Sequence, residues 1–83
     1  MPVKAVRVRV TWDDAEDPCE GVTWLSAAQV RAFAAKRCTI VSVGYLVCKT
    51  AHYIAIAADL TNDGYYGRVT KIPNGMIASI EEV

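Results

Sequence analysis

The sequence predicts a mostly β domain of the α+β class, with one helix and five strands. Apolar and polar residues alternate with a period of two near the N-terminus, as in a strand with one buried face. One short alanine-rich stretch has the capping residues of a helix, and apolar segments separated by turn residues fill the second half. Because 83 residues is the size of one domain, we expect residues 1–83 to form a single unit.

The first strand is expected at the N-terminus, followed by a loop. Its apolar positions are Val6, Val8, Val10 and Trp12, and its polar positions are Arg7, Arg9 and Thr11. The next stretch, TWDDAEDPCEGVTW (residues 11–24), contains Pro18 and Gly21, which favour a loop. Its carboxylates, between Asp13 and Glu20, lack the order of a calcium loop. We therefore expect a solvated loop, with a cation or partner site as the alternative.

The clearest helix pattern begins at Ser26 and continues to Lys36. Ser26 and Gln29 form an S-x-x-Q capping box, and Leu25 and Val30 occupy the positions of a hydrophobic staple. We expect one apolar stripe on this helix, formed by Val30, Phe33 and Ala34. The cations Arg31, Lys36 and Arg37 should lie on the solvent-facing side or at the C-terminal end of the helix.

The remaining chain is expected to be β-rich. The segment CTIVSVGYLV (38–47) is apolar on both parities, which predicts a long strand covered on both sides, with a bend permitted at Gly44. It should form a hairpin with HYIAIAADL (52–60). If Leu46 pairs with Ile54 inside, then Tyr45, Val47 and Tyr53 form an outer apolar patch that the helix or another subunit covers.

Two further strands complete the order. TNDGYYG (61–67) predicts a turn, RVTKI (68–72) a strand, PNG (73–75) a tight turn and MIASIEEV (76–83) a closing strand. The order β-loop-α-β-β-β-β, with a long bent strand, is what a small five-stranded barrel of the SH3-like or Sm-like type would show.

Several motifs resemble a known group of proteins. VTWDDA, a second tryptophan, SVGYLV, YIAIA and KIPNGMIASIEE together resemble small proteins encoded in bacteriophage and prophage genomes. In those proteins the pattern runs approximately W-x-D-A, G-W, S-V-G-Y-L and I-P-x-G-M-I. Here Val22-Thr23-Trp24 replaces the adjacent G-W, with Gly21 displaced. The resemblance implies a viral accessory protein with a small β-barrel, acting in the host cytoplasm, and it supplies no activity.

Composition and motifs argue against several functional classes. Nine basic residues balance nine acidic ones, so nucleic-acid binding is not expected, although Lys4, Arg7 and Arg9 lie on the outer face of the first strand. No apolar run is long enough to span a membrane, and no secretory leader is visible, which favours a cytoplasmic protein.

Catalytic and metal chemistry have no motif in this sequence. The three cysteines, Cys19, Cys38 and Cys48, show no metal-ligand spacing, and the single histidine, His52, is the only base available to pair with a thiol. No nucleophile elbow or Walker sequence is present. We therefore expect no enzyme, no metal and no cofactor.

Aromatic and basic residues provide the basis for a functional hypothesis. Aromatic faces stack bases and nearby cations bind phosphates. The candidate ligand-binding residues are Trp12, Tyr45, Tyr53, Tyr65, Tyr66, Arg68 and Lys71. We expect a binding protein that captures a small nucleotide-like ligand, such as a host defence signal, on or between the subunits of a homo-oligomer. The alternatives are an inhibitor that binds a host protein directly and a structural, oligomer-forming module.

Overall fold

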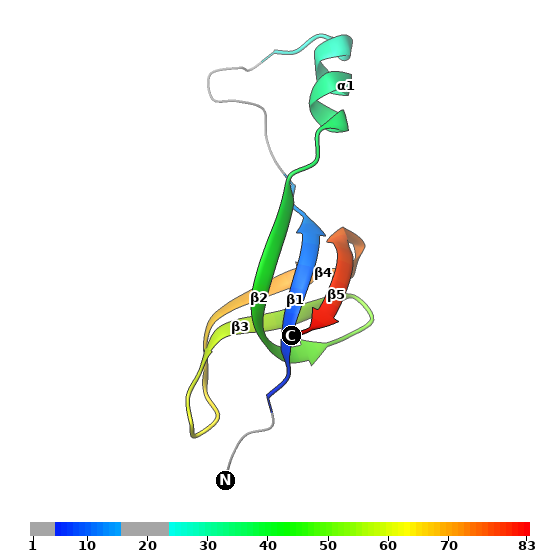
Figure 1. Cartoon of the computed structure of the whole chain (residues 1–83). Coiled ribbons are helices and arrows are strands. Elements are labelled where there is room, and N and C mark those ends of the chain that lie inside the picture. Colours follow the sequence, from blue (N-terminus) through cyan, green and yellow to red (C-terminus); the bar gives the residue numbers. More distant parts are fainter. Residues whose placement is uncertain (1–4, 16–23) are drawn as a thin grey trace.

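A computed structural model describes residues 5–15 and 24–83, which form five strands, one α-helix and one 3₁₀ turn (Figure 1). The elements are β1 (Arg7–Asp13), α1 (Ala27–Ala35), β2 (Thr39–Lys49), β3 (Tyr53–Leu60), β4 (Tyr66–Pro73), η1 (Asn74–Met76) and β5 (Ile77–Glu82). The predicted element order is therefore confirmed for the described residues. The fourth strand begins at Tyr66, so Tyr66 and Gly67 belong to β4 and not to the turn.

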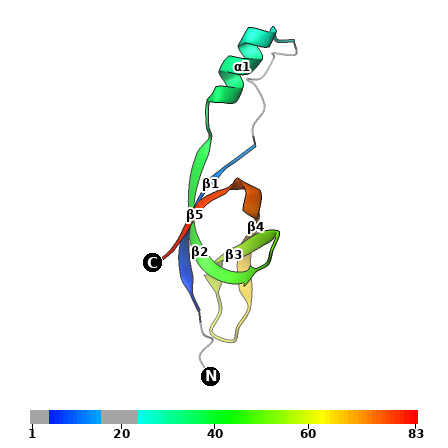
Figure 2. The ribbon, with the colours of Figure 1, turned by 90° about the vertical axis from the view of Figure 1, so that its right-hand side faces the viewer.

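All five strands form one antiparallel sheet in the order β4-β3-β2-β1-β5. The first half of β2 pairs with β1 and its second half pairs with β3, so β2 belongs to both halves of the sheet. Figure 2 shows how strongly the sheet curves. Within the described residues β4 and β5 do not pair with each other, so the sheet is not closed. A mostly β fold is confirmed, and a closed barrel is not.

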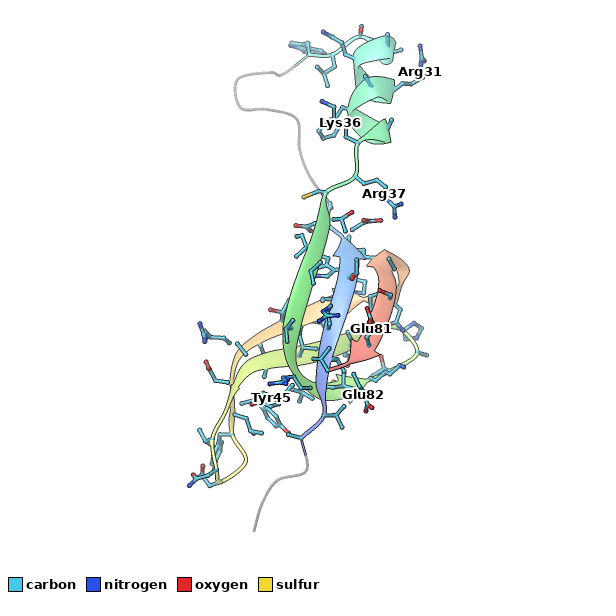
Figure 3. The ribbon with its side chains drawn as sticks, viewed as in Figure 1. Arg31, Lys36, Arg37, Tyr45, Glu81 and Glu82 are labelled. Atoms are coloured by element: carbon cyan, nitrogen blue, oxygen red, sulfur yellow. The ribbon has the colours of Figure 1, made fainter. Side chains whose placement is uncertain are left out.

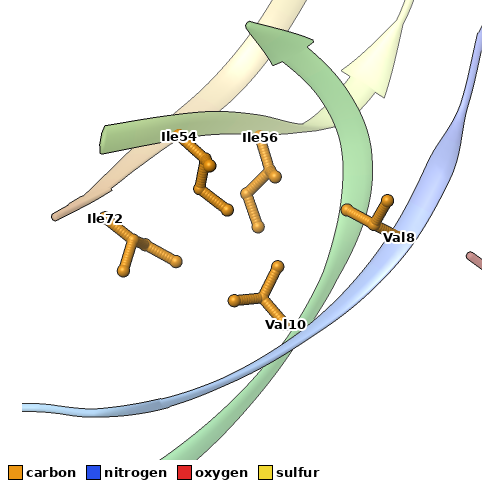
Figure 4. Close-up of a cluster of buried hydrophobic side chains, with 5 residues drawn as sticks. All are labelled: Val8, Val10, Ile54, Ile56 and Ile72. Atoms are coloured by element: carbon orange, nitrogen blue, oxygen red, sulfur yellow. The ribbon is translucent and has the colours of Figure 1, made fainter. Parts of the chain in front are cut away.

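The core lies inside the curve of the sheet. Its buried cluster consists of Val8, Val10, Ile54, Ile56 and Ile72 (Figure 4). These residues come from β1, β3 and β4, and the pairs Ile54 with Ile72 and Val8 with Gly44 are direct cross-strand neighbours. Because directly paired residues share a face of the sheet, the two-residue period of the sequence places all five on the inner face.

Gly44 lies where β2 passes close to the backbone of β3. A Cβ atom at this position would lie 2.8 Å from the carbonyl oxygen of Ala57, closer than such contacts normally occur. The bend expected at Gly44 therefore has a steric reason, since only glycine leaves room for the backbone of β3.

The predicted register of the β2–β3 hairpin was wrong by two residues. Leu46 pairs with Ile56, not with Ile54, and Tyr45 pairs with Ala57. The register shifts between Leu46 and Cys48, which leaves Val47 as the extra residue of a bulge. A bulge adds one residue to one strand and none to its partner. The alternation of apolar and polar residues within each strand therefore does not indicate where the pairing shifts.

The helix begins at its predicted cap and extends away from the sheet (Figures 1 and 2). Ser26 Oγ accepts a hydrogen bond from the Gln29 backbone N–H at 3.2 Å, and Gln29 Oε1 accepts one from the Ser26 N–H at 2.9 Å. The capping box is therefore confirmed. None of the helical residues is buried, so the stripe of Val30, Phe33 and Ala34 does not face the core.

The helix consequently leaves the outer face of β2 uncovered. Val41, Val43 and Val47 are exposed, so the expectation that this strand is covered on both sides is wrong for the single chain. The segment Trp24–Arg37, here called the helical arm, accounts for much of the molecule's 58 Å length, which compares with 23 and 21 Å in the other directions.

Candidate functional site

The seven predicted ligand-binding residues lie in three separate places. Tyr65, Tyr66 and Arg68 belong to the β3–β4 turn and the start of β4. Trp12 lies at the far end of β1, on the inner face. Tyr45, Tyr53 and Lys71 lie on the outer face of β2, β3 and β4. The structure therefore does not bring the seven residues into one site.

The β3–β4 turn presents its tyrosines to solvent. Thr61 Oγ1 donates a hydrogen bond to Asp63 Oδ1 at 2.6 Å and accepts one from the Tyr65 N–H at 2.9 Å. Gly64 has a φ of 93°, which glycine adopts without strain. Tyr65 is 69% exposed, and Tyr66 is also exposed. The pair therefore lies outside the core.

Arg68 is engaged by a neighbouring carboxylate. Its Nε and Nη2 atoms donate hydrogen bonds to Asp59 Oδ2 and Oδ1 at 2.7 and 3.0 Å, a two-point contact across the hairpin. These hydrogen bonds hold the pKa of Asp59 below, and that of Arg68 above, its ordinary value. Arg68 also has a positive φ of 51°, unusual for this residue type. Arg68 therefore links the two strands, and a phosphate would have to compete with Asp59 for it.

Trp12 packs toward the core. Its indole Nε1 donates a hydrogen bond to Ser42 Oγ at 3.1 Å, and its ring packs against the buried cluster. The direct partner of Trp12 in β2 is Ile40, on the inner face. A satisfied polar group on a half-buried ring is typical of a tryptophan that fills space in a small domain. Trp12 does not share a face with Tyr45 or Tyr53.

The outer face of the sheet combines two tyrosines with two cations. Direct cross-strand pairs place Arg7, Tyr45, Ala57 and Val69 in one row across β1, β2, β3 and β4. Cys48, Ala55 and Lys71 form the next row. Because paired residues share a face, both rows lie on the side opposite the core. We call the set Arg7, Tyr45, Tyr53, Ala55, Ala57 and Lys71 the tyrosine face.

Each tyrosine of this face has a cation beside it. The Nζ atom of Lys71 lies 5.4 Å from the centroid of the Tyr53 ring, a cation–π contact. Arg7 is the direct cross-strand partner of Tyr45, which lies where β2 curves toward β3 (Figure 3). Among residues 5–15 and 24–83, no carboxylate forms a salt bridge with Arg7 or Lys71. Both cations are therefore available to bind the phosphate of a ligand.

Two buried alanines of β3 lie between the two tyrosines on the same face. Ala57 is 0% exposed and Ala55 is 9% exposed, although neither belongs to the core cluster. Exposures this low mean that neighbouring atoms already cover both methyl groups, so a ligand here would contact the rings and cations and not the alanines. The sequence pattern did not indicate Arg7 or the two alanines as site residues. The alternation of the first strand put Arg7 outside, but only its pairing partner places it beside Tyr45.

The base of the helical arm is held by Asp13. Asp13 Oδ2 accepts hydrogen bonds from Nε and Nη2 of Arg37, the first at 3.1 Å, and Oδ1 accepts one from Thr39 Oγ1 at 3.0 Å. The Arg37 and Thr39 hydrogen bonds hold the pKa of Asp13 below its ordinary value. Asp13 is therefore not simply a solvated loop residue. The rest of the acidic stretch from Glu16 to Glu20 lies outside the described residues.

The tip of the arm exposes an aromatic ring. Trp24 is 90% exposed, and Val30 is exposed on the helix. Between Trp24 and Cys38 the sequence contains Arg31, Lys36 and Arg37 and no acidic residue. Figure 3 shows these three cations along the arm.

The described residues offer little for metal or thiol chemistry. Over 5–15 and 24–83, no group of three or more His, Cys, Asp or Glu side chains lies close enough to bind a metal ion. Cys38 and Cys48 are free thiols there, and no hydrogen bond joins either to His52. His52 lies in the β2–β3 turn, where its carbonyl oxygen accepts a hydrogen bond from the Asn74 N–H at 2.8 Å.

The helix is too short to span a membrane, and the chain has no detected relatives among known proteins. In the described part of the chain, no helix has the length and apolar character needed to cross a bilayer. Comparison with known proteins found no matching family model, no matching curated protein and no matching solved structure.

Proposed function

We propose that this chain is a non-enzymatic binding module that captures a small nucleotide-like ligand on its tyrosine face. One observation carries the proposal: on one face of the sheet, Tyr53 lies under Lys71 and Tyr45 lies opposite Arg7. Ring stacking on tyrosine and a charged hydrogen bond from a neighbouring cation are the two contacts that a nucleotide needs.

The proposal includes a small barrel as its scaffold. The strand order β4-β3-β2-β1-β5, a β2 shared by both halves of the sheet, and the 3₁₀ turn between β4 and β5 support an SH3-like or Sm-like arrangement. The motif resemblance supports a phage-encoded accessory protein that acts in the host cytoplasm against a host signal. In that role binding alone is sufficient, since removing a signal requires no chemical step.

Calorimetry with purified protein tests the proposal. We expect adenosine and guanosine mononucleotides, or small molecules built from them, to bind with a Kd below 1 mM, an affinity of about −4 kcal/mol. Removing both cations with the double variant Arg7→Ala, Lys71→Ala should weaken binding roughly 10- to 100-fold, the equivalent of about 1.5–3 kcal/mol for a hydrogen bond to a charged group. The double variant Arg31→Ala, Lys36→Ala is the matched control, because these two exposed cations lie on the helical arm and not on the tyrosine face. If no nucleotide binds, the proposal fails and direct inhibition of a host protein becomes the leading hypothesis.

Self-association is a second candidate function, favoured by a separate observation. No helical residue of the arm is buried, and Val41 and Val43 are exposed on the outer face of β2. An isolated nine-residue helix is marginal in water, so packing against another copy would stabilise it. The simplest such assembly is a dimer.

Light scattering at tens of micromolar separates this candidate from a monomeric binding module. Val43→Lys should dissociate a dimer while the sheet remains folded. Asn62→Lys adds the same charge on the exposed β3–β4 turn and should leave the dimer intact. A monomer for the unaltered protein would rule out self-association.

A further inference from the structure

The tyrosine face contains two half-sites, each with one tyrosine and one cation. One consists of Tyr53 and Lys71, and the other of Tyr45 and Arg7. Each combines a half-buried ring, suited to stacking, with a cation that has no carboxylate partner among the described residues. A ligand with a single ring would use only one of these half-sites.

The spacing of the half-sites suits a longer ligand. Tyr45 pairs with Ala57, and Ala57 lies four residues from Tyr53 along β3. At about 3.3 Å per residue, the two tyrosines are separated by about 13 Å along the strand direction. Ala55 and Ala57 lie between them on the outer face of β3. Because both alanines are buried, a ligand that spans the two rings has to move aside the neighbouring side chains that cover them.

We propose that the tyrosine face binds a dinucleotide, with one base stacked on Tyr45, the other stacked on Tyr53, and the phosphates beside Arg7 and Lys71. The inference rests on the proposed function and narrows it from nucleotide-like ligands in general to those with two bases. Joining the two bases covalently makes the second contact intramolecular, so the gains of the two half-sites combine.

The magnitude follows from stacking. A base stacked on an aromatic side chain contributes about 1–3 kcal/mol, which corresponds to roughly 5- to 150-fold in affinity. A dinucleotide should therefore bind roughly 5- to 150-fold more tightly than the matching mononucleotide. It should do so with one ligand per chain.

Calorimetry with four probes tests the inference: adenosine monophosphate, a linear adenine dinucleotide, a cyclic adenine dinucleotide and a four-base adenine strand. We expect the better dinucleotide to bind more tightly than the monophosphate, and the four-base strand to add little. Tyr45→Ala and Tyr53→Ala should each reduce dinucleotide affinity toward that of the monophosphate. Each should change monophosphate affinity only about twofold, because one of two equivalent half-sites remains.

Conservative variants keep the test independent of folding. Tyr45→Phe and Tyr53→Phe retain the stacking ring and should retain dinucleotide binding, even if an alanine variant is unstable. Equal affinities for the monophosphate and the dinucleotides, with binding weakened by only one of the two tyrosine-to-alanine changes, would overturn the inference and leave the proposed function intact. Much tighter binding of the four-base strand than of either dinucleotide would also overturn the inference, and would favour single-stranded nucleic acid as the ligand. Absence of binding by all four probes and by guanosine monophosphate would remove the proposed function itself.

Discussion

Gly44 provides the sharpest test of how the sheet is built. Replacing Gly44 with Ala would place a Cβ atom 2.8 Å from the Ala57 carbonyl oxygen and 3.3 Å from its carbon. Both atoms are backbone, so no flexible side chain can move aside, and β2 or β3 must shift. Forcing an extra methyl group into a close-packed position costs about 1–3 kcal/mol.

Urea denaturation followed by circular dichroism measures this cost. A loss of 1 kcal/mol lowers the melting temperature of a domain of this size by roughly 4–8 °C, so thermal melts provide a second readout. Gly75→Ala is the matched control, because nothing lies within 4 Å of its added Cβ atom. We expect Gly75→Ala to change stability by less than about 0.5 kcal/mol. Equal stabilities of the two variants would show that β2 and β3 do not approach as described.

Two other predictions concern the arm and the surface ion pairs. Ser26→Ala removes the helix cap and costs about 1 kcal/mol of helix stability. Because no residue of α1 is buried, this loss should lower the helical circular dichroism signal and leave the midpoint of the main unfolding transition unchanged. A lower midpoint would mean that the helix packs on the sheet. Hydrogen bonds from Arg37 and Arg68 lower the folded-state pKa values of Asp13 and Asp59. The stability that these two ion pairs contribute is therefore present above the unfolded-state pKa of about 3.9, and it is lost as the pH falls through the lower folded-state pKa values. The Asp13→Asn, Asp59→Asn double variant should therefore melt below the unaltered protein at pH 7 and converge with it in acid, and a constant difference across that range would contradict the assignment.

Local patterns in the sequence predicted the elements well. The capping box of Ser26 and Gln29 depends on residues three apart, so the sequence contains all the information it requires. The alternation from Val6 to Trp12 likewise identified the inner and outer faces of β1. These features are decided by neighbours in the chain.

Features that depend on distant pairing were not predictable in the same way. The bulge at Val47 changed the partner of Leu46 from Ile54 to Ile56, and nothing in either strand alone indicates it. The helix has an apolar stripe, but a stripe does not determine whether its partner is this sheet or another molecule. For the site, Tyr53 and Lys71 were named and do meet. Arg68 was named as a phosphate contact without its Asp59 partner, nine residues away.

The position of the bound ligand on the sheet distinguishes the tyrosine face from the other two groups of residues, and NMR chemical shifts measure that position. Amide spectra of the labelled protein would be recorded during titration with a cyclic adenine dinucleotide. We predict that the largest shifts map to Arg7, Tyr45, Ala55, Ala57 and Lys71, across four strands of one face. Shifts confined to Tyr65 and Tyr66 on the β3–β4 turn, or to the surroundings of Trp12 on the inner face, would contradict the account.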